Sequence, residues 1–259
     1  MLISCEIMSK TVVITGAASG MGLSDTRKFL ENNWNVVMAD FDEKNGSKVA
    51  TELQKEFPKV KVLFQKVDVS DENSVQTLAD VVLENFDSVD NIINNAGVFA
   101  KGALHELDSK TWDKIMKIDV KSIFLMTKAF IPTMIKQGKV VITNIASVSG
   151  LMGDYNMAVY SAAKGAVVNL VKSMALDYGK YGIRVNNIAP GPTNTAMFQK
   201  NPQNIIDKFN NSSPLGHVVQ PEDIANMAYF LASDQAKSIT GQNIQVTAGF
   251  GIYSGQPIQ

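Results

Sequence analysis

Short apolar runs rich in β-branched residues alternate along the chain with longer helical patterns. Several runs lack the polar–apolar alternation of a half-exposed strand, which indicates strands covered on both faces. We predict strands at Thr11–Thr15, Asn35–Asp40, Val60–Asp68, Val89–Asn94, Lys139–Ile145, Arg184–Ile188 and Asn243–Val246. The clearest helices between them are Ser24–Asn32, Glu72–Asn85, Ser109–Gln137, Ala158–Tyr178 and Pro221–Ala232.

The alternation of strands and helices continues from one end of the chain to the other, and no linker or repeat interrupts it. This pattern predicts a single α/β domain over residues 10–259, built on a doubly wound parallel sheet of about seven strands with helices on both faces. We expect residues 1–9 to be a mobile leader. Residues 191–220 are rich in Asn, Pro, Ser and Thr. Because they follow a strand, at the edge where parallel sheets bind ligands, we expect a lid over a substrate.

Composition excludes several classes of protein. Among 259 residues, 24 Lys and Arg face 25 Asp and Glu, so the net charge of −1 carries no electrostatic signature of nucleic-acid binding. No apolar run approaches the roughly 18 residues of a membrane span. The start of the chain lacks the basic region of a signal peptide, and the single cysteine, Cys5, fits a reducing compartment. We therefore expect a cytoplasmic protein without membrane or nucleic-acid partners.

A glycine-rich loop, TGAASGMG, follows the first predicted strand and precedes a helix. It contains Gly16, Gly20 and Gly22, with Ser19 and Met21 between them. Glycines at such a place allow a tight turn and let the backbone approach a pyrophosphate at the helix N-terminus. Taken alone, the three glycines are equally compatible with a plain turn.

An acidic residue stands where a dinucleotide would place its adenosine ribose. Asp40 closes the second predicted strand, 24 residues after Gly16. A carboxylate there accepts hydrogen bonds from ribose hydroxyls and repels a 2′-phosphate. No basic residue adjoins Asp40 in the sequence, and Ser19 occupies a loop position that could have carried Arg. We therefore expect NAD as the cofactor rather than NADP, although Asp40 also fits a solvated turn.

The segment AVYSAAKGAVV places Tyr160 four residues before Lys164, so both side chains share one helix face. A tyrosine is a weak base at neutral pH, and a nearby ammonium group favours its phenolate. Ser147 follows the fifth predicted strand and would point into the same crevice, where its hydroxyl could stabilise an oxygen that gains charge. An exposed Tyr–Lys pair without function is the simpler alternative for this spacing alone.

These motifs together resemble the short-chain dehydrogenase/reductase family, from about residue 10 to residue 250. The resemblance is carried by TGAASGMG, Asp68–Val69, NNAG at 94–97, Ser147, Tyr160 with Lys164, and PGPTNT at 190–195. It implies a single Rossmann domain, a nicotinamide cofactor, oxidation of alcohols or reduction of carbonyls, and a homotetramer or dimer. It also implies that Tyr160 transfers the proton and that Lys164 binds the nicotinamide ribose.

The same resemblance assigns further cofactor contacts. It places Asp68 and Val69 beside the adenine, and Asn95, Ala96 and Gly97 beside the adenosine end. It places Pro190, Gly191, Thr193 and Thr195 near the nicotinamide. Both of the last two groups could instead be ordinary turns after strands.

Asp119 departs from the family, which usually has Asn at the matching position in a proton relay. An ionised carboxylate accepts hydrogen bonds but cannot donate one. Two outcomes are open for Asp119. In the first, Asp119 pairs with Lys164 and weakens the effect of that ammonium on Tyr160, which would move the rate optimum to higher pH. In the second, Asp119 is a solvated or structural carboxylate and the proton relay differs.

The expected substrate pocket is mostly apolar and includes Phe99, Tyr155 and Met197. We therefore expect an uncharged alcohol or ketone, such as a polyol, a small diol, or an alicyclic or steroid alcohol. An NADPH-dependent reductase of carrier-bound 3-oxoacyl groups is the enzymatic alternative, and a non-catalytic nucleotide-binding sensor or scaffold is the other. The two histidines, His105 and His217, have no cluster of acids or cysteines near them in the sequence, so we expect no metal.

Overall fold

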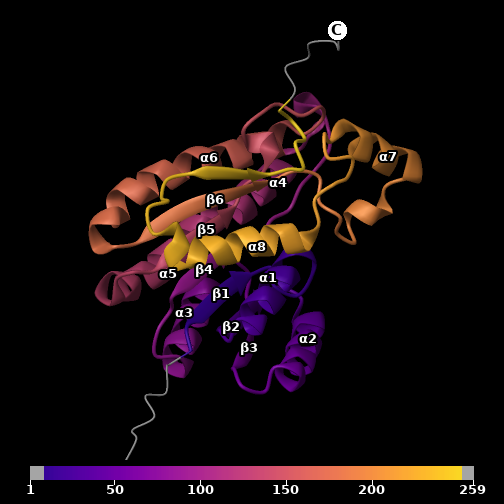
Figure 1. The fold of residues 1–259 in the computed structure, drawn as a ribbon. Coiled ribbons are helices and arrows are strands. Elements are labelled where there is room, and N and C mark those ends of the chain that lie inside the picture. Colours follow the sequence, from indigo (N-terminus) through magenta and orange to yellow (C-terminus); the bar gives the residue numbers. More distant parts are fainter. Residues whose placement is uncertain (1–8, 253–259) are drawn as a thin grey trace, which may run out of the picture.

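Seven parallel strands form one sheet in the order β3-β2-β1-β4-β5-β6-β7. The structure is a computed structural model, and it describes residues 9–252 (Figure 1). The strands are β1 (Thr11–Thr15), β2 (Asn35–Asp40), β3 (Val62–Lys66), β4 (Asn91–Asn94), β5 (Val141–Ile145), β6 (Arg184–Pro190) and β7 (Asn243–Val246). The predicted leader and the last seven residues of the predicted domain lie outside the described residues, apart from Ser9.

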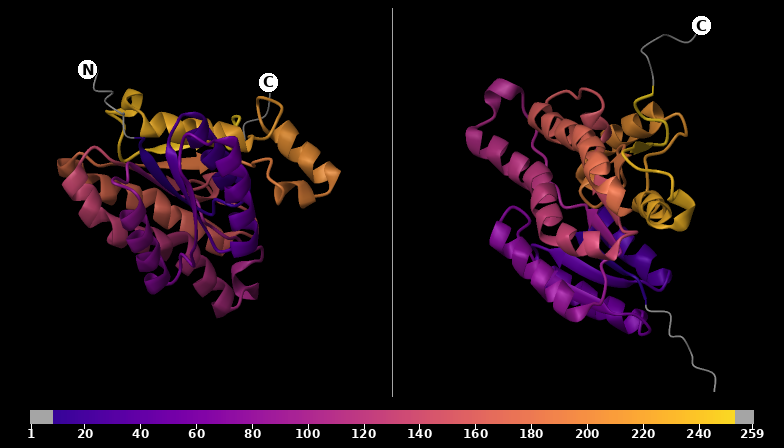
Figure 2. Two further views of the ribbon diagram at one scale, coloured as in Figure 1. Left: turned by 90° about the horizontal axis from the view of Figure 1, so that it is seen from below. Right: turned by 90° about the vertical axis from the view of Figure 1, so that its left-hand side faces the viewer.

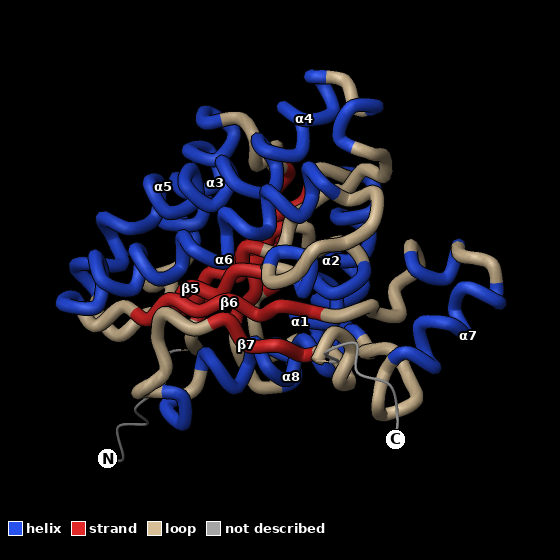
Figure 3. Tube along the Cα trace, turned by 90° about the horizontal axis from the view of Figure 1, so that it is seen from above, coloured by secondary structure: helices blue, strands red, loops and turns tan. Residues whose placement is uncertain are grey.

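Helices cover both faces of the sheet, as Figures 2 and 3 show. Apolar side chains of α3, α5 and α6 pack on one face, and those of α1, α2 and α8 pack on the other. The bounds are α1 (Gly20–Glu31), α2 (Glu43–Glu56), α3 (Glu72–Asn85), α4 (Ser109–Ile115), α5 (Ser122–Gln137), α6 (Ala158–Tyr178), α7 (Gln203–Ser212) and α8 (Pro221–Ala232). The α/β fold with helices on both faces of a doubly wound sheet is therefore confirmed. Within the described part of the chain, no helix is long and apolar enough to cross a membrane.

The structure corrects the predicted helices in three places. Helix α1 begins at Gly20, four residues before the predicted start, because the glycine loop leads directly into its first turn. The segment predicted as one helix over 109–137 is α4 and α5 joined by a π-helical stretch, Met116–Lys121. Helices α2 and α7 were not predicted; α7 lies inside the expected lid segment and projects from the body of the molecule (Figure 1).

The chain order creates a switch point between β1 and β4. After β1 the chain builds β2 and β3 on one side, then returns to β4 on the other side of β1. Loops at the carboxyl ends of these two strands diverge, which opens a crevice in sheets of this kind. The glycine loop follows β1, NNAG follows β4, Ser147 follows β5, and PGPTNT begins at the end of β6. All predicted motifs of the site thus reach the same edge of the sheet.

Candidate active site

The glycine loop is bound to the segment after β4. Gly16 and Gly20 have left-handed backbone torsions, with φ of 65° and 55°, which a side chain would disfavour. A Cβ atom on Gly22 would lie 2.2 Å from the Gly16 carbonyl oxygen. The Asn95 side-chain amide donates to the carbonyl oxygens of Thr15 and Gly16 at 2.9 and 3.1 Å. The loop therefore forms a cradle that needs glycine at these positions, and the side-chain amide of Asn95 binds the first residues of the loop to the segment after β4.

This cradle fits a dinucleotide pyrophosphate. Helix α1 begins inside the loop, and its first turn contains no acidic residue that would neutralise the positive end of the helix dipole. Ser19 precedes the helix and makes no side-chain capping hydrogen bond. The methyl group of Thr195 lies 3.6 Å from the position of a Cβ on Gly20, so the predicted nicotinamide segment closes onto the loop.

Asp40 is tied to the glycine loop, as its Oδ2 accepts a hydrogen bond from the Ala18 backbone N–H at 2.8 Å. The sequence did not reveal that Lys66 stands opposite Asp40 in the register of β2 and β3. The Lys66 ammonium forms an ion pair with Glu43 at 2.9 Å, so it is occupied by another carboxylate.

The predicted adenine contacts lie at the next strand end. Asp68 Oδ1 accepts hydrogen bonds from the backbone N–H and the hydroxyl of Ser70, at 2.9 and 2.7 Å. Val69 is buried. This arrangement fixes the turn between β3 and α3 beside the crevice.

Lys164 is the most constrained charged group of the site. It lies on α6 and is 4 % exposed. Its Nζ donates to the Ile145 carbonyl oxygen at 2.8 Å, lies 3.1 Å from Asp119 Oδ2, and is 5.7 Å from the centre of the Tyr160 ring. Burial alone lowers the pKa of the ammonium, but the negative charges of Asp119 and ionised Tyr160 outweigh it, and the pKa of Lys164 is raised. Lys164 therefore remains a cation beside the phenol.

Ser147 lies at the carboxyl end of β5, where the chain turns into a short 3-10 helix. Its Oγ accepts a hydrogen bond from the Ser149 backbone N–H at 3.1 Å. Since that bond uses a lone pair of the oxygen, the Ser147 hydroxyl proton remains available to donate. Ser149 donates its own hydroxyl proton to Asp154 at 2.5 Å.

Asp119 pairs with Lys164, as the first of the two expectations requires; the expected effect of this pair on Tyr160 stays a prediction. The π-helical stretch carries Asp119 into the interior, where its Oδ1 also accepts from the Val98 backbone N–H at 2.8 Å. A Cβ on Gly97 would lie 3.0 Å from Asp119 Oδ2 and 3.4 Å from Lys164 Nζ. Gly97 therefore packs directly against the ion pair, and Ala96 precedes it, with its N–H donating to the Thr15 hydroxyl at 3.0 Å.

The segment after β6 lies along the end of β7. The Gly191 N–H donates to the Val246 carbonyl at 3.0 Å, and a Cβ on Gly191 would lie 3.0 Å from the Thr247 backbone. Pro190 is the last residue of β6, and Thr193 donates its hydroxyl proton to the Gly191 carbonyl at 2.9 Å.

The expected substrate residues differ in their surroundings. Phe99 stands edge-on to Tyr160, with ring centres 6.4 Å apart, so it adjoins the predicted acid–base residue. Met197 is exposed in the segment expected to form a lid, just before a short 3-10 helix. Tyr155 is 99 % exposed, so in this structure it does not line an enclosed pocket.

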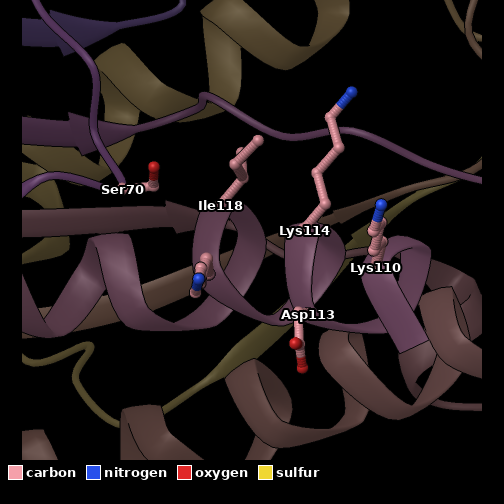
Figure 4. A pocket seen from close by; sticks show the side chains of 6 residues that line it. Ser70, Lys110, Asp113, Lys114 and Ile118 are labelled. Carbon is pink, nitrogen blue, oxygen red and sulfur yellow. The ribbon is translucent and has the colours of Figure 1, made fainter.

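A separate surface cavity of about 300 Å³ lies beside α4 (Figure 4). It is lined by Ser70, Lys110, Asp113, Lys114, Lys117 and Ile118. Ser70 lies in the loop before α3, the other residues lie on α4 and the π-helical stretch after it, and none is Ser147, Tyr160 or Lys164. Among residues 9–252, no group of three or more His, Cys, Asp or Glu side chains is arranged to hold a metal ion.

A row of asparagines across β4, β5, β6 and β7 was not predicted from the sequence: Asn94, Asn144 and Asn187 are buried, and Asn243 is partly exposed. Their presence in otherwise apolar strands was the available signal.

A glycine cradle at a switch point, beside a buried lysine close to a partly exposed tyrosine and an oriented serine, defines a dinucleotide-binding oxidoreductase site. A family profile described as enoyl-(acyl carrier protein) reductase matches residues 16–251. Meso-2,3-butanediol dehydrogenase of Serratia marcescens is 41% identical over 249 residues, covering 96% of this chain and 97% of that protein. Trans-4-hydroxycyclohexanecarboxylate dehydrogenase of Sinomonas cyclohexanicum is 35% identical and covers 95% of each chain.

Among solved structures, the 3-ketoacyl-(acyl-carrier-protein) reductase of Brucella melitensis complexed with NADH superposes with a TM-score of 0.86. It is 32% identical, and the match covers 94% of this chain and 99% of that one. The chain belongs to the short-chain dehydrogenase/reductase family, and it is an oxidoreductase that acts on alcohol groups.

Proposed function

We propose that this protein is an NAD-dependent dehydrogenase that interconverts a small uncharged secondary alcohol, with a vicinal diol as the first candidate, and its ketone. The observation that carries the proposal is the buried cation of Lys164, held by Ile145 and Asp119 beside the Tyr160 ring. The relative named for butanediol supports an uncharged diol, and the relative named for hydroxycyclohexanecarboxylate, whose substrate carries a carboxylate, supports only a secondary alcohol.

The side chains have distinct tasks in this proposal. Tyr160, as phenolate, accepts the proton of the substrate hydroxyl during oxidation and returns it during reduction. Ser147 donates a hydrogen bond to the substrate oxygen, and Lys164 stabilises the phenolate and binds ribose hydroxyls. Bound nicotinamide would accept or return the hydride.

The preference for NAD rests on Asp40 at the end of β2. Its carboxylate would repel a 2′-phosphate, and the one lysine opposite it is paired with Glu43. The glycine cradle, with Met21 in the first turn of α1, would hold the pyrophosphate; Asp68, Val69 and Asn95–Gly97 would hold the adenosine end. Pro190, Gly191, Thr193 and Thr195 would hold the nicotinamide end.

The substrate would lie between Tyr160, Phe99 and the lid residue Met197, with Tyr155 at the rim. These groups are uncharged, so an anionic substrate would find no counterion among them. The carrier-bound 3-oxoacyl reductase stays the second candidate, because both the family profile and the Brucella structure are described as carrier-protein reductases.

Turnover assays with two cofactors and two substrate classes test the proposal. We expect the wild-type protein to oxidise meso-2,3-butanediol with NAD+ much faster than with NADP+, and to reduce a 3-oxoacyl thioester poorly. Faster reduction of the thioester with NADPH would favour the second candidate. No turnover with any alcohol or ketone, alongside tight NADH binding, would favour a sensor or scaffold.

Tyr160→Phe tests the assignment of the acid–base group. We expect the variant to lose roughly a thousandfold in kcat, because general acid–base groups contribute about 10²–10⁴. NADH affinity, measured by fluorescence titration, should change by less than about twofold because the phenol hydroxyl acts on the substrate. A variant that retains near-normal turnover would refute the assignment.

We also propose a homotetramer, as the family resemblance implies. Exposed apolar residues on the long helices support it: Phe124 on α5 and Leu176 on α6 are largely exposed. A cytoplasmic location remains the expectation from composition.

A further inference from the structure

Four asparagines form one continuous row across the half of the sheet that carries α6. Asn94, Asn144, Asn187 and Asn243 are register partners in β4, β5, β6 and β7. The side-chain amide of each donates to the amide oxygen of the next, at 2.8, 3.0 and 2.7 Å. The first three side chains are buried, so the row replaces apolar packing in the middle of the core.

The row also binds the helix above it. Asn187 Nδ2 donates to the Val167 carbonyl oxygen at 2.9 Å, and Asn243 Nδ2 donates to the Val168 carbonyl oxygen at 3.0 Å. Both carbonyls lie in the middle of α6, which crosses this part of the sheet (Figure 3). Two adjacent strands therefore hold two consecutive residues of one helix by directed bonds.

Apolar side chains would hold α6 less specifically. Hydrophobic contacts permit a helix to slide or rotate by fractions of an ångström, whereas a hydrogen bond weakens steeply when its geometry changes. A buried amide that loses its partner is destabilising, and a shifted helix would leave several such groups unpaired.

Helix α6 carries the reacting groups about one turn (Lys164) and about two turns (Tyr160) before these bonds. Tyr160 and Lys164 lie on it, and Lys164 reaches the carbonyl of Ile145, the residue that follows Asn144. After β5, a Cβ on Gly150, in the short 3-10 helix that follows Ser147, would lie 2.5 Å from the Lys164 carbonyl carbon, so the Ser147 loop and α6 are in close backbone contact. The row thus links β5, which ends two residues before Ser147, with the helix that carries Tyr160.

We propose that the asparagine row positions α6 on the sheet and thereby sets the place of Tyr160 and Lys164 relative to Ser147. Asn187 and Asn243 are the positioning residues, since they contact α6 and touch neither substrate nor cofactor. This inference rests on the proposed function in one respect, because its kinetic readout needs turnover by Tyr160.

The chain provides a matched control on the same strand. Asn186 is as buried as Asn187 and also forms two side-chain hydrogen bonds, to the Ile239 carbonyl and from the Gln242 N–H. These partners lie after α8, away from α6. We therefore compare Asn187→Ala with Asn186→Ala.

Asn187→Ala should lower kcat for butanediol oxidation by about tenfold or more, since small misplacements of reacting groups can cost up to about 10². It should leave NADH affinity within about twofold, since the row lies beneath the crevice. Asn186→Ala should lower thermal stability but retain kcat at temperatures where it is folded. If both variants keep wild-type kcat, or both lose it equally, the row does not position the site.

Hydrogen exchange of the intact protein gives a readout that needs no turnover. Amides of residues 158–168 should exchange faster in Asn187→Ala than in wild type and should be unchanged in Asn186→Ala. If Asn187→Ala does not fold, Asn243→Ala, which removes one bond to α6, should give a smaller change of the same kind. Unchanged exchange at 158–168 in the folded variant would overturn the proposal even if the proposed function held. Faster exchange without alcohol turnover in wild type would support the row and refute the function.

Discussion

The Ile145 carbonyl, Asp119 and Tyr160 each favour the charged form of Lys164. They therefore determine the pH range in which this residue is an ammonium ion. Because its pKa in the folded protein is raised above 10.5, the ion pair with Asp119 contributes its full stability below that value. The contribution is lost only as the pH rises through the raised pKa. Assays at neutral or moderately alkaline pH therefore act on an intact Lys164–Asp119 pair.

The carboxylate of Asp119 should set the pH range of the reaction. In Asp119→Asn, the negative charge that offsets Lys164 is gone, so the phenolate of Tyr160 is stabilised to a lower pH. Burial, no longer opposed by Asp119, also lowers the pKa of Lys164. Both limbs of the pH–rate profile for alcohol oxidation should therefore move to lower pH.

Asp113→Asn is the matched control, because Asp113 lies exposed on α4 and contacts neither group. Its profile should coincide with that of wild type. An unmoved profile in Asp119→Asn would reduce Asp119 to a structural carboxylate that caps the Val98 N–H.

Among single residues, the sequence predicted which side chains belong to the site better than it predicted the groups that these side chains contact. The spacing of Tyr160 and Lys164 follows from helical periodicity, which is a local property. The contacts to the Ile145 carbonyl and the Val98 N–H could not be predicted. Every residue has a backbone carbonyl, and almost every residue has an N–H, so only the three-dimensional packing determines which of these groups a side chain meets. The pairing of Asp119 with Lys164 came from the structure for the same reason, and its effect on Tyr160 is left to the pH–rate profile.

Where β1 passes into α1, the backbone atoms of the loop pack so closely that there is no room for a side chain at Gly22. Gly22→Ala would place a Cβ 2.2 Å from the Gly16 oxygen and 2.6 Å from the Asn95 amide. The loop must open to relieve these contacts, so we expect the dissociation constant for NADH to rise by about tenfold or more, since about 1.4 kcal/mol of misfit gives a factor of ten. The thermal midpoint should fall as well.

Gly179→Ala is the control for this change, because a Cβ at Gly179 meets nothing within 4 Å and its backbone is helical, with φ of −57°. It should keep both NADH affinity and thermal midpoint. Equal behaviour of the two variants would show that the cradle tolerates a methyl group.

Helices with a high content of apolar residues were predicted with their observed ends, as at α3, α6 and α8. The misses have physical causes. Helices α2 and α7 are mostly polar and bury few side chains, so they were not recognised among the surrounding polar segments: α2 buries Gly46, Ala50 and Leu53, and α7 buries Ile206. The start of α1 was missed because glycine disfavours helices, a local preference that the cofactor cradle overrides.

The stability of the whole molecule should depend on one carboxyl group that the site does not use. Asp25 lies on the buried stripe of α1 with Gly22, Thr26, Phe29 and Leu30. Neither of its oxygens has a hydrogen-bond partner among the described residues. Burial raises the pKa of Asp25 from 3.8 to about 8. The folded protein thus holds a proton there that the unfolded chain releases near pH 4.

The sign of the effect follows from linkage. Below about pH 4, Asp25 is protonated in both the folded and the unfolded protein, so its ionisation does not affect stability. Between about pH 4 and 8, it ionises more readily in the unfolded chain, and the free energy of unfolding falls as the pH rises. Above about pH 8, it is ionised in both states and this loss of free energy is constant. With 1.36 kcal/mol per unit, the plateau is on the order of 5 kcal/mol. Asp25→Ala should therefore gain free energy of unfolding relative to wild type as the pH rises, up to about pH 8, beyond which the gain levels off.

Urea unfolding of both proteins from pH 5 to 9 measures this difference. Any cavity left by alanine changes the free energy of unfolding by the same amount at every pH. The slope of the difference against pH therefore reports the ionisation of Asp25 and not the change in packing. Asp80→Ala, at an exposed position of α3, should differ from wild type by the same amount at every pH. A difference for Asp25→Ala that is equally flat would mean that Asp25 is ionised in the folded protein throughout this range. If the expected slope is found, the alkaline conditions that favour alcohol oxidation are those in which the fold is least stable.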